Sequence, residues 1–474
     1  MRNPTPTPLP DSVKQDTYTQ TAGFSTGPDA PAAKMLARSV TLNAIGNAGS
    51  LLIGFVGSIL LARWLGPGDR GLLAVLQASS VFALTLGAIG TPMAVLYYAS
   101  LPTRSTPALL GTTLAYGAAL GGVLVPLAWL AHSELAHILS KGQGGLAWVL
   151  AAALVPITFL DWTTHNQILG RLGFGLYNAL TLLGKLLSLA LIALLVGGLG
   201  WGVSGGLVAL GGASVVMVAG CLPPLLREGR PRFDRTVLAT LMRYGAKVQI
   251  GTIFMSLNYR LDVVILQFFV PLSAVGYYVI AQIVAELVIV IANSFQASVV
   301  TLVAGSEKAD RDRTTMLATR HHGILAAVAC LGNVGFGTAL IEVAYGHPYH
   351  SAILPMLIIL PGIWFLGAGS VVTSDLRGRG RPGLASQVSG AAVVVTVALD
   401  LALVPPFGII GAAFASLVAY TTFGLLGLRT LSRTAGIPVR RLVVPERADL
   451  AAYPAVARAV VRRLRPAGTA DVAS

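Results

Sequence analysis

The sequence has few charged residues and few cysteines. Charged residues make up 11% of its 474 residues, whereas hydrophobic residues make up 54% and glycine occurs 54 times. This composition is unlike that of soluble globular domains and predicts an integral membrane protein. The two cysteines, Cys221 and Cys330, lie in apolar stretches. A disulfide framework is therefore excluded.

Motifs for catalysis are also absent. The chain has no Walker motif, no GxGxxG after a strand, no HExxH motif and no Ser-His-Asp set with a supporting context. We therefore expect a protein that is not an enzyme, does not hydrolyse ATP, and holds neither a cofactor nor a structural metal.

What the sequence does contain is a series of long apolar runs. A helix needs roughly 20 apolar residues to cross about 30 Å of hydrocarbon. Such runs predict an all-α fold with twelve transmembrane helices. The predicted spans are 34–62, 71–99, 107–131, 145–168, 175–198, 201–226, 245–270, 274–303, 323–345, 352–375, 383–405 and 408–431.

Acidic residues are scarce, and the basic residues fall into every second gap between the spans. Of 33 Lys and Arg residues, 28 lie on one side of the predicted membrane, and only Arg63, Arg70 and Lys141 lie in loops on the other side. This bias predicts a multi-pass protein of the cytoplasmic membrane with both termini in the cytoplasm. The net charge of +14 thus indicates contact with membrane lipids and no nucleic acid.

The two halves of the chain resemble each other. At an offset of 205 residues, Gly71 and Gln77 fall on Gly276 and Gln282 without a gap. An even number of spans separates equivalent positions, which predicts two pseudo-symmetric six-helix lobes in the same orientation with a substrate path between them. The predicted organisation is a disordered leader (1–33), an N-lobe (34–226), a cytoplasmic linker (227–244), a C-lobe (245–431), and a basic tail (432–474) with an interfacial helix at 453–465.

Two motifs carry a family resemblance. The first is ILLARWLGPGDRGLLAVLQ at 59–77, which contains the pattern LAR-x-LGP-x-x-x-G, and the second runs from Asp262 through Val275-Gly276-Tyr277-Tyr278. Over residues 34–431 the chain resembles the polysaccharide-transport family of the multidrug/oligosaccharidyl-lipid/polysaccharide (MOP) exporter superfamily. The resemblance implies a MATE-like fold, an O-antigen-type flippase activity, a tight external turn at Gly66-Pro67 and a close-packed helix start at Gly71.

Polar residues follow one face of several spans. Burying a charge at the bilayer centre costs roughly 2.5–3.5 kcal/mol on insertion scales, so these faces are expected to line a wet cavity or to contact another helix. The substrate-binding candidates are Lys185, Arg260, Asn178, Thr181, Asn43 and Asn47. The candidates for a coupling-ion site (Na⁺ or H⁺) or a structural role are Asp161, Glu286, Asp262 and Asp400.

The two cations inside the spans admit two interpretations. Lys185 and Arg260 either bind an anionic substrate or form ion pairs within the protein, with Asp161 and Glu286 as their partners. Arg260 lies about 200° around its helix from Asp262, so the two side chains cannot both point into one cavity. Asp262 belongs to the family-like motif and is the better candidate for holding neighbouring helices together.

Three functions compete on this evidence. The leading one is a flippase for polyprenyl-diphosphate-linked oligosaccharides that works by alternating access. The second is an ion-coupled exporter of small compounds, and the third is a membrane glycosyltransferase or polymer ligase. A flippase of this kind is expected to be a monomer whose partners are the lipid-linked sugar, membrane lipids and the polysaccharide polymerase or glycosyltransferase machinery.

Overall fold

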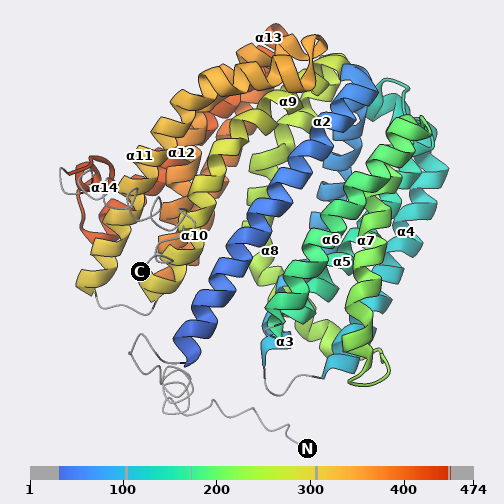
Figure 1. Ribbon diagram of the computed structural model, residues 1–474, viewed down its shortest axis with the longest axis horizontal. Coiled ribbons are helices and arrows are strands. Elements are labelled where there is room, and N and C mark those ends of the chain that lie inside the picture. The colour runs from blue at the N-terminus through green and yellow to red at the C-terminus, as the bar shows by residue number, and fades with distance from the viewer. Residues whose placement is uncertain (1–30, 102–104, 172, 305–307, 447–448, 450–474) are drawn as a thin grey trace, which may run out of the picture.

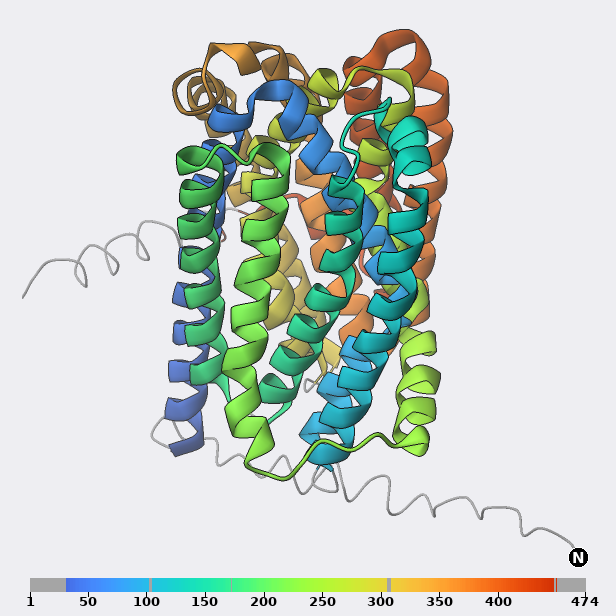
Figure 2. The ribbon, with the colours of Figure 1, turned by 90° about the vertical axis from the view of Figure 1, so that its right-hand side faces the viewer.

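The computed structural model describes residues 31–101, 105–171, 173–304, 308–446 and 449. Within these ranges the chain is helical and contains no strand. The long helices run in the same general direction (Figure 2). The α-helices are α2 (Pro31–Ala88), α3 (Thr91–Ser100), α4 (Thr106–Ser140), α5 (Ala147–Gly170), α6 (Phe174–Ile192), α7 (Gly202–Leu226), α8 (Arg235–Phe269), α9 (Leu272–Ala285), α10 (Ile289–Ala304), α11 (Lys308–Leu340), α12 (Ile353–Gly378), α13 (Pro382–Ala435) and α14 (Val439–Val443).

Glycine divides two of the longest helices. α2 breaks at Gly66 and α13 breaks at Gly408, where the backbone leaves the helical region with positive φ. A residue with a Cβ adopts such a conformation at a steric cost, and Pro67 then restarts the helix. The turn implied at Gly66-Pro67 is therefore present. α13 covers the last two predicted spans, whereas α2 covers the first and part of the second, which continues in α3.

Nine helical segments of the described part are long and apolar enough to cross a membrane. Two of them are the kinked segments in α2 and α13, and α8 covers the predicted seventh span although it carries more charge. The helix boundaries therefore fit a multi-pass membrane protein, while the count of twelve spans stays a prediction.

Short irregular turns interrupt other spans. The π-helices η1 (Ala193–Gly198) and η3 (Ile341–Tyr345) end two spans, and the 3₁₀ turn η2 (Glu286–Val288) separates α9 from α10. A further 3₁₀ turn, η4 (His347–Ala352), precedes α12. Such interruptions are frequent at functional positions because they free backbone groups and redirect side chains.

The helices form two lobes. α4 to α7 lie together on one side of the molecule and α10 to α13 on the other, with α2 and α8 between them (Figure 1). The lobes approach closely where α2 meets α9. A Cβ on Gly71 would overlap the carbonyl of Leu272, and a Cβ on Gly276 would overlap the carbonyl of Pro67. The two glycines that the internal repeat pairs thus lie against each other, because small residues let membrane helices pack at the backbone.

Some predicted boundaries differ from the structure. The predicted linker 227–244 is shorter, because α8 already begins at Arg235. The Asp234 carboxylate accepts hydrogen bonds from the backbone N–H groups of Thr236 and Val237 and so caps the helix there. The predicted leader reaches 33, whereas α2 begins at Pro31. The interfacial helix expected at 453–465 lies outside the described residues.

Candidate functional site

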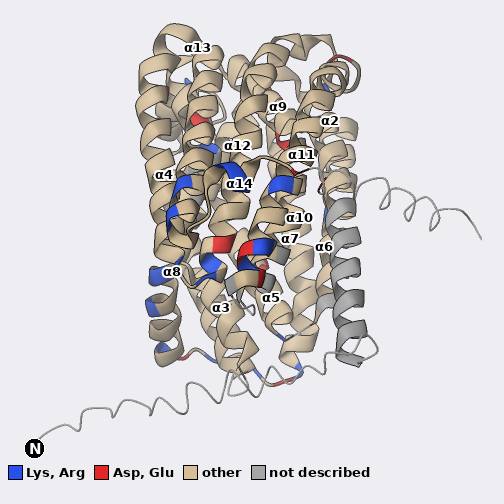
Figure 3. Ribbon diagram, turned by 90° about the vertical axis from the view of Figure 1, so that its left-hand side faces the viewer, with Lys and Arg blue, Asp and Glu red and all other residues tan. Residues whose placement is uncertain are grey.

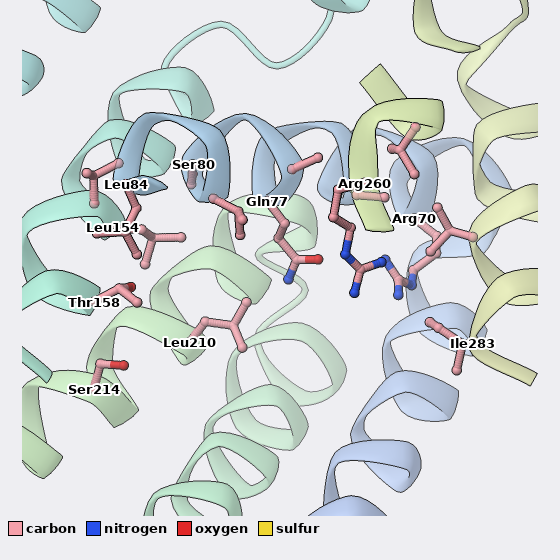
Figure 4. A pocket seen from close by; sticks show the side chains of 16 residues that line it. Arg70, Gln77, Ser80, Leu84, Leu154, Thr158, Leu210, Ser214, Arg260 and Ile283 are labelled. Atoms are coloured by element: carbon pink, nitrogen blue, oxygen red, sulfur yellow. The ribbon is translucent and has the colours of Figure 1, made fainter. Parts of the chain in front are cut away.

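A cavity of about 360 Å³ lies between the two lobes. Its walls come from α2, α5 and α7 of the N-lobe and from α8 and α9 of the C-lobe. Most of the lining is aliphatic; Arg70, Arg260 and Gln77 lie together toward one end, and Thr158 and Ser214 lie toward the other (Figure 4). These polar lining residues are Arg70, Gln77, Ser80, Thr158, Ser214 and Arg260.

Arg70 enters this cavity from the first turn after the Gly66 break. Its side chain is only 5% exposed, and its Nε and Nη1 atoms have no hydrogen-bond partner in the described part of the chain. Tyr345 and Tyr349 lie close enough to interact with its charge. The sequence placed Arg70 in a loop, which is wrong, because the helix resumes at Pro67 and carries Arg70 inward.

Arg260 reaches the same cavity from α8, on the opposite side. The two guanidinium groups lie side by side, with Gln77 next to them (Figure 4). Among the described residues, no acidic side chain forms an ion pair with either arginine. The alternative in which Glu286 pairs with Arg260 is therefore not observed, although Glu286 lies near enough to interact with its charge.

Asp262 points away from the cavity, as its position on α8 predicts. Its carboxylate accepts hydrogen bonds from the hydroxyl of Tyr278 at 2.6 Å, from Nε2 of Gln282 at 2.6 Å and from the backbone N–H of Val263 at 2.8 Å. The Tyr278 hydroxyl also lies 2.9 Å from Oγ of Ser416. Asp262 thus joins α8 to α9 and α13, and it connects the two parts of the second family-like motif.

Near the hydrogen-bonded cluster of Asp262, Tyr278, Gln282 and Ser416, two carboxylates have buried oxygens without a hydrogen-bond partner among the described residues, those of Asp400 and Glu286. Asp400 is fully buried, and neither of its carboxylate oxygens has a hydrogen-bond partner among the described residues. It lies close enough to Asp262 and Tyr278 for their charges to interact. Glu286 begins η2, and its Oε1 atom is buried without a partner in the same part of the chain.

Three further N-lobe candidates whose side chains are described, Asp161, Lys185 and Thr181, are not among the residues that line the cavity. Asp161 pairs with His165 on its own helix, with Oδ1 and Nδ1 2.7 Å apart, so the pair with Lys185 is not observed. Lys185 is exposed on α6. Leu183, which lies about 160° away around the same helix, is exposed as well, so exposure does not distinguish the face that carries Lys185. Thr181 donates to a carbonyl of its own helix, Asn178 is half-buried, and the side chains of Asn43 and Asn47 lie outside the described part.

Hydrogen bonds join the two lobes at the end near Gly66. Arg63 donates from Nε to the carbonyl of Ala344 and from Nη2 to that of Val343, both at 2.6 Å. Tyr349 donates its hydroxyl to the carbonyl of Ala62 at 2.9 Å. These three bonds join α2 of the N-lobe to η3 and η4 of the C-lobe, and we call them the lobe seal.

Arg70 is the cavity residue that the sequence reasoning missed, together with Ser214 as a lining residue, whereas Gln77, Ser80 and Thr158 belong to polar stripes that were expected to line a cavity or contact a helix. A usable signal was present, since positions 70, 74, 77, 81 and 84 repeat at steps of four and three and share one face of α2. The step of seven from Arg70 to Gln77 places both side chains on the same face of α2, and that face lines the cavity between the lobes.

Comparison with known proteins identifies the class. Residues 36–304 match the family model described as "Polysaccharide biosynthesis protein". The matched range is more than half of the chain, so the chain belongs to this family of polysaccharide biosynthesis proteins. It is 26% identical over 180 residues to a probable flippase, AglR, of Haloferax volcanii. That alignment covers 36% of this chain and 38% of the relative, so the chain spans well under half of the relative's length.

Solved structures show the same fold. An inward-facing multidrug-resistance MATE family transporter of the MOP superfamily superposes with a TM-score of 0.69 at 16% identity, covering 83% of this chain and 98% of that one. The lipid II flippase MurJ in an inward closed conformation superposes with a TM-score of 0.68 at 14% identity, covering 90% and 93%. The expected MATE-like, two-lobed membrane fold is thereby confirmed.

Proposed function

We propose that the protein is a flippase for polyprenyl-diphosphate-linked oligosaccharides, which it moves across the cytoplasmic membrane by alternating access between the two lobes. Membership of the polysaccharide biosynthesis protein family supports this function, as does the similarity to a probable flippase. In the proposed orientation both termini lie in the cytoplasm, and the substrate comes from membrane-bound glycosyltransferases.

The observation that carries the proposal is the pair of adjacent arginines, neither of which forms an ion pair with an acidic side chain in the described part of the chain. Taking two like charges out of water is unfavourable unless a counter-charge enters with them. A diphosphate supplies two or more negative charges, and guanidinium groups bind phosphate oxygens in a bidentate geometry. The cavity is thus suited to the diphosphate of a lipid-linked sugar, and it repels the small organic cations that a multidrug exporter carries.

The size and lining of the cavity limit which part of the substrate it holds. A volume of about 360 Å³ accommodates a ligand at the small end of the usual range and no whole oligosaccharide. We therefore assign the cavity to the diphosphate and the first sugar. The prenyl chain stays in the lipid, and rocking of the lobes makes room for the remaining sugars.

Asp400 and Asp262 are the proposed site for a coupling ion. Two carboxylates in one buried cluster repel each other when both are charged, and a bound proton or Na⁺ removes that repulsion. The cluster joins α8, α9 and α13, so its occupancy can favour one packing of these helices over another. Asp161 and Glu286 take structural roles in this proposal.

Transport of a fluorescent polyprenyl-diphosphate sugar by reconstituted protein tests the function. Arg70→Gln and Arg260→Gln should each lower the flipping rate about 10- to 100-fold, because a hydrogen bond to a charged group contributes roughly 1.5–3 kcal/mol. Arg243→Gln is the matched control, since Arg243 is exposed on α8 outside the cavity. Parental rates in both cavity variants would contradict the mechanism, and transport of cationic dyes alone would favour the exporter.

A further inference from the structure

Exposed arginines surround one hydrophobic cluster at the end of the C-lobe. The cluster is formed by the last turns of α12, both ends of α13 and the short helix α14, with Leu376, Leu431 and Leu442 fully or almost fully buried in it. The same segments carry five exposed arginines. These five residues, which we call the C-lobe arginine face, are Arg377, Arg381, Arg433, Arg440 and Arg441.

Two neighbouring arginines are already paired, which sets the arginine face apart. Arg379 forms ion pairs with Asp375 at 2.6 Å and with Asp312 at 2.8 Å. Arg320 pairs with Glu446 at 2.7 Å and with Asp449 at 3.3 Å. Basic and acidic positions accordingly lie together around α14 (Figure 3). Four acidic residues, Asp312, Asp375, Glu446 and Asp449, are thus paired with these two arginines, and among the described residues no ion pair joins an acidic side chain to the arginine face.

The face is held in a fixed position. Arg320 on α11 is almost fully buried, and its Nε atom donates to the carbonyl of Arg441 at 2.7 Å. Ile437 and Leu442 are buried on the inner side of the segment that contains α14. Arg440 and Arg441 are consequently directed outward from a helix that is tied to the lobe by both ion pairs and apolar packing.

We propose that the C-lobe arginine face binds the phosphate of anionic phospholipids in the surrounding membrane. α12 and α13 are long and apolar enough to span the bilayer, so arginines at their ends lie at the level of the lipid headgroups. Arginine matches the geometry of a phosphate, and an anionic membrane surface attracts such a cluster. Because the described acidic residues do not neutralise the face, lipid phosphates supply the missing charge.

The excess of Lys and Arg that cytoplasmic loops of membrane proteins carry does not by itself explain this arrangement. A cytoplasmic loop needs only an excess of Lys and Arg, which flexible residues in separate loops satisfy equally well. Here three separate segments bring their arginines around one apolar cluster, and a buried ion-pair network fixes the third segment. Such an arrangement predicts a localised lipid site, whereas loops such as the α7–α8 connection are expected to attract lipid only diffusely.

Native mass spectrometry of the purified full-length chain, titrated with short-chain phosphatidylglycerol or phosphatidylcholine, tests the site. The parent should bind phosphatidylglycerol at least tenfold more tightly. Arg440→Gln/Arg441→Gln should weaken phosphatidylglycerol binding about 25-fold, because each basic residue near an anionic surface contributes roughly fivefold. Arg377→Gln/Arg381→Gln should act in the same direction, and phosphatidylcholine binding should not change.

The matched control removes the same charge from Arg230 in the α7–α8 connection and from Arg235, the first residue of α8, both of which are exposed. Arg230→Gln/Arg235→Gln should keep the parental affinity for phosphatidylglycerol. Equal loss in this control, or parental affinity in both double variants of the arginine face, would overturn the proposal. The titration contains no lipid-linked sugar, so its result is independent of whether the protein is a flippase.

Discussion

At the scale of single residues, Gly71 and Gly276 set how closely the two lobes approach. Each lies so near the partner's backbone that a methyl group would overlap a carbonyl, that of Leu272 for Gly71 and that of Pro67 for Gly276. Backbone atoms yield less readily than the end of a flexible side chain, so the added methyl has to push the helices apart. The contact therefore requires glycine at both positions.

We expect Gly71→Ala to lower the thermal unfolding midpoint by several degrees and to reduce flipping, since overpacking costs typically about 1–3 kcal/mol. Gly276→Ala should act in the same way from the other helix. Gly68→Ala is the control, because a Cβ at Gly68 meets no atom within 4 Å. Unchanged melting of Gly71→Ala in a thermal-shift assay would show that the helices separate here without cost.

The sequence predicted single residues where a motif or a helical spacing constrained them. The family resemblance implies the turn at Gly66 and the close packing of Gly71, helical spacing predicts the direction of Arg260, and the structure agrees with each. Arg70 could not be placed in the same way, because Gly66-Pro67-Gly68-Asp69 has the composition of a loop. The spacing of positions 70, 74, 77, 81 and 84 is the sequence signal that favours a helix here, and the packing of α2 against α9 shows that the helix restarts at Pro67 and buries the arginine.

At the scale of elements, α8 connects the two lobes. Its first turns lie against α3 and α4 of the N-lobe, while Val263 and Leu266 near its other end belong to the main hydrophobic core. The sequence predicted this helix from its apolar run, but its start was placed ten residues late because the first turns are polar. The cap at Asp234 is a local signal for the true start.

Asp234 should make the stability of α8 depend on pH. The backbone N–H groups of Thr236 and Val237 stabilise the carboxylate and hold its pKa below the ordinary value of 3.8. Because the pKa in the folded state is lowered, the stabilisation is present above pH 3.8 and is lost as the pH falls through the lowered value. Asp234→Asn keeps the cap without titrating, so its unfolding midpoint should fall less than that of the parent between pH 5 and pH 3. A parallel fall in both proteins would contradict this role.

Breaks within the spans were not predictable from the apolar runs. Hydrophobicity determines where a helix crosses the membrane but is insensitive to a π-helix or a 3₁₀ turn inside it. η2 places Glu286 within a predicted span, and η3 places Tyr345 beside Arg70. Both depend on contacts between helices that are far apart in the sequence, which a single sequence does not specify.

At the scale of the whole molecule, the described conformation is closed at the end near Gly66, and the lobe seal has to break before the cavity opens there. Its three hydrogen bonds contribute about 3 kcal/mol together, since each contributes roughly 0.5–1.5 kcal/mol net. Removing them should increase the open population by up to about 100-fold, because 1.4 kcal/mol corresponds to a factor of ten. We therefore predict that Arg63→Gln/Tyr349→Phe speeds labelling of a cysteine at Gln77 by an impermeant thiol reagent added outside the cell, in a background without Cys221 and Cys330.

The direction of that change separates gating from damage to the fold. If the seal controls an equilibrium between two packings, labelling from the outside rises about 10- to 100-fold and labelling from the cytoplasmic side falls by mass action. A variant whose fold is merely loosened is labelled faster by the thiol reagent from both sides of the membrane. His347→Gln is the matched control, because His347 is exposed on the same connection and stacks only on His350 among the described residues. An unchanged outside rate in the double variant would show that contacts elsewhere, such as that between Gly71 and Gly276, keep the lobes closed by themselves.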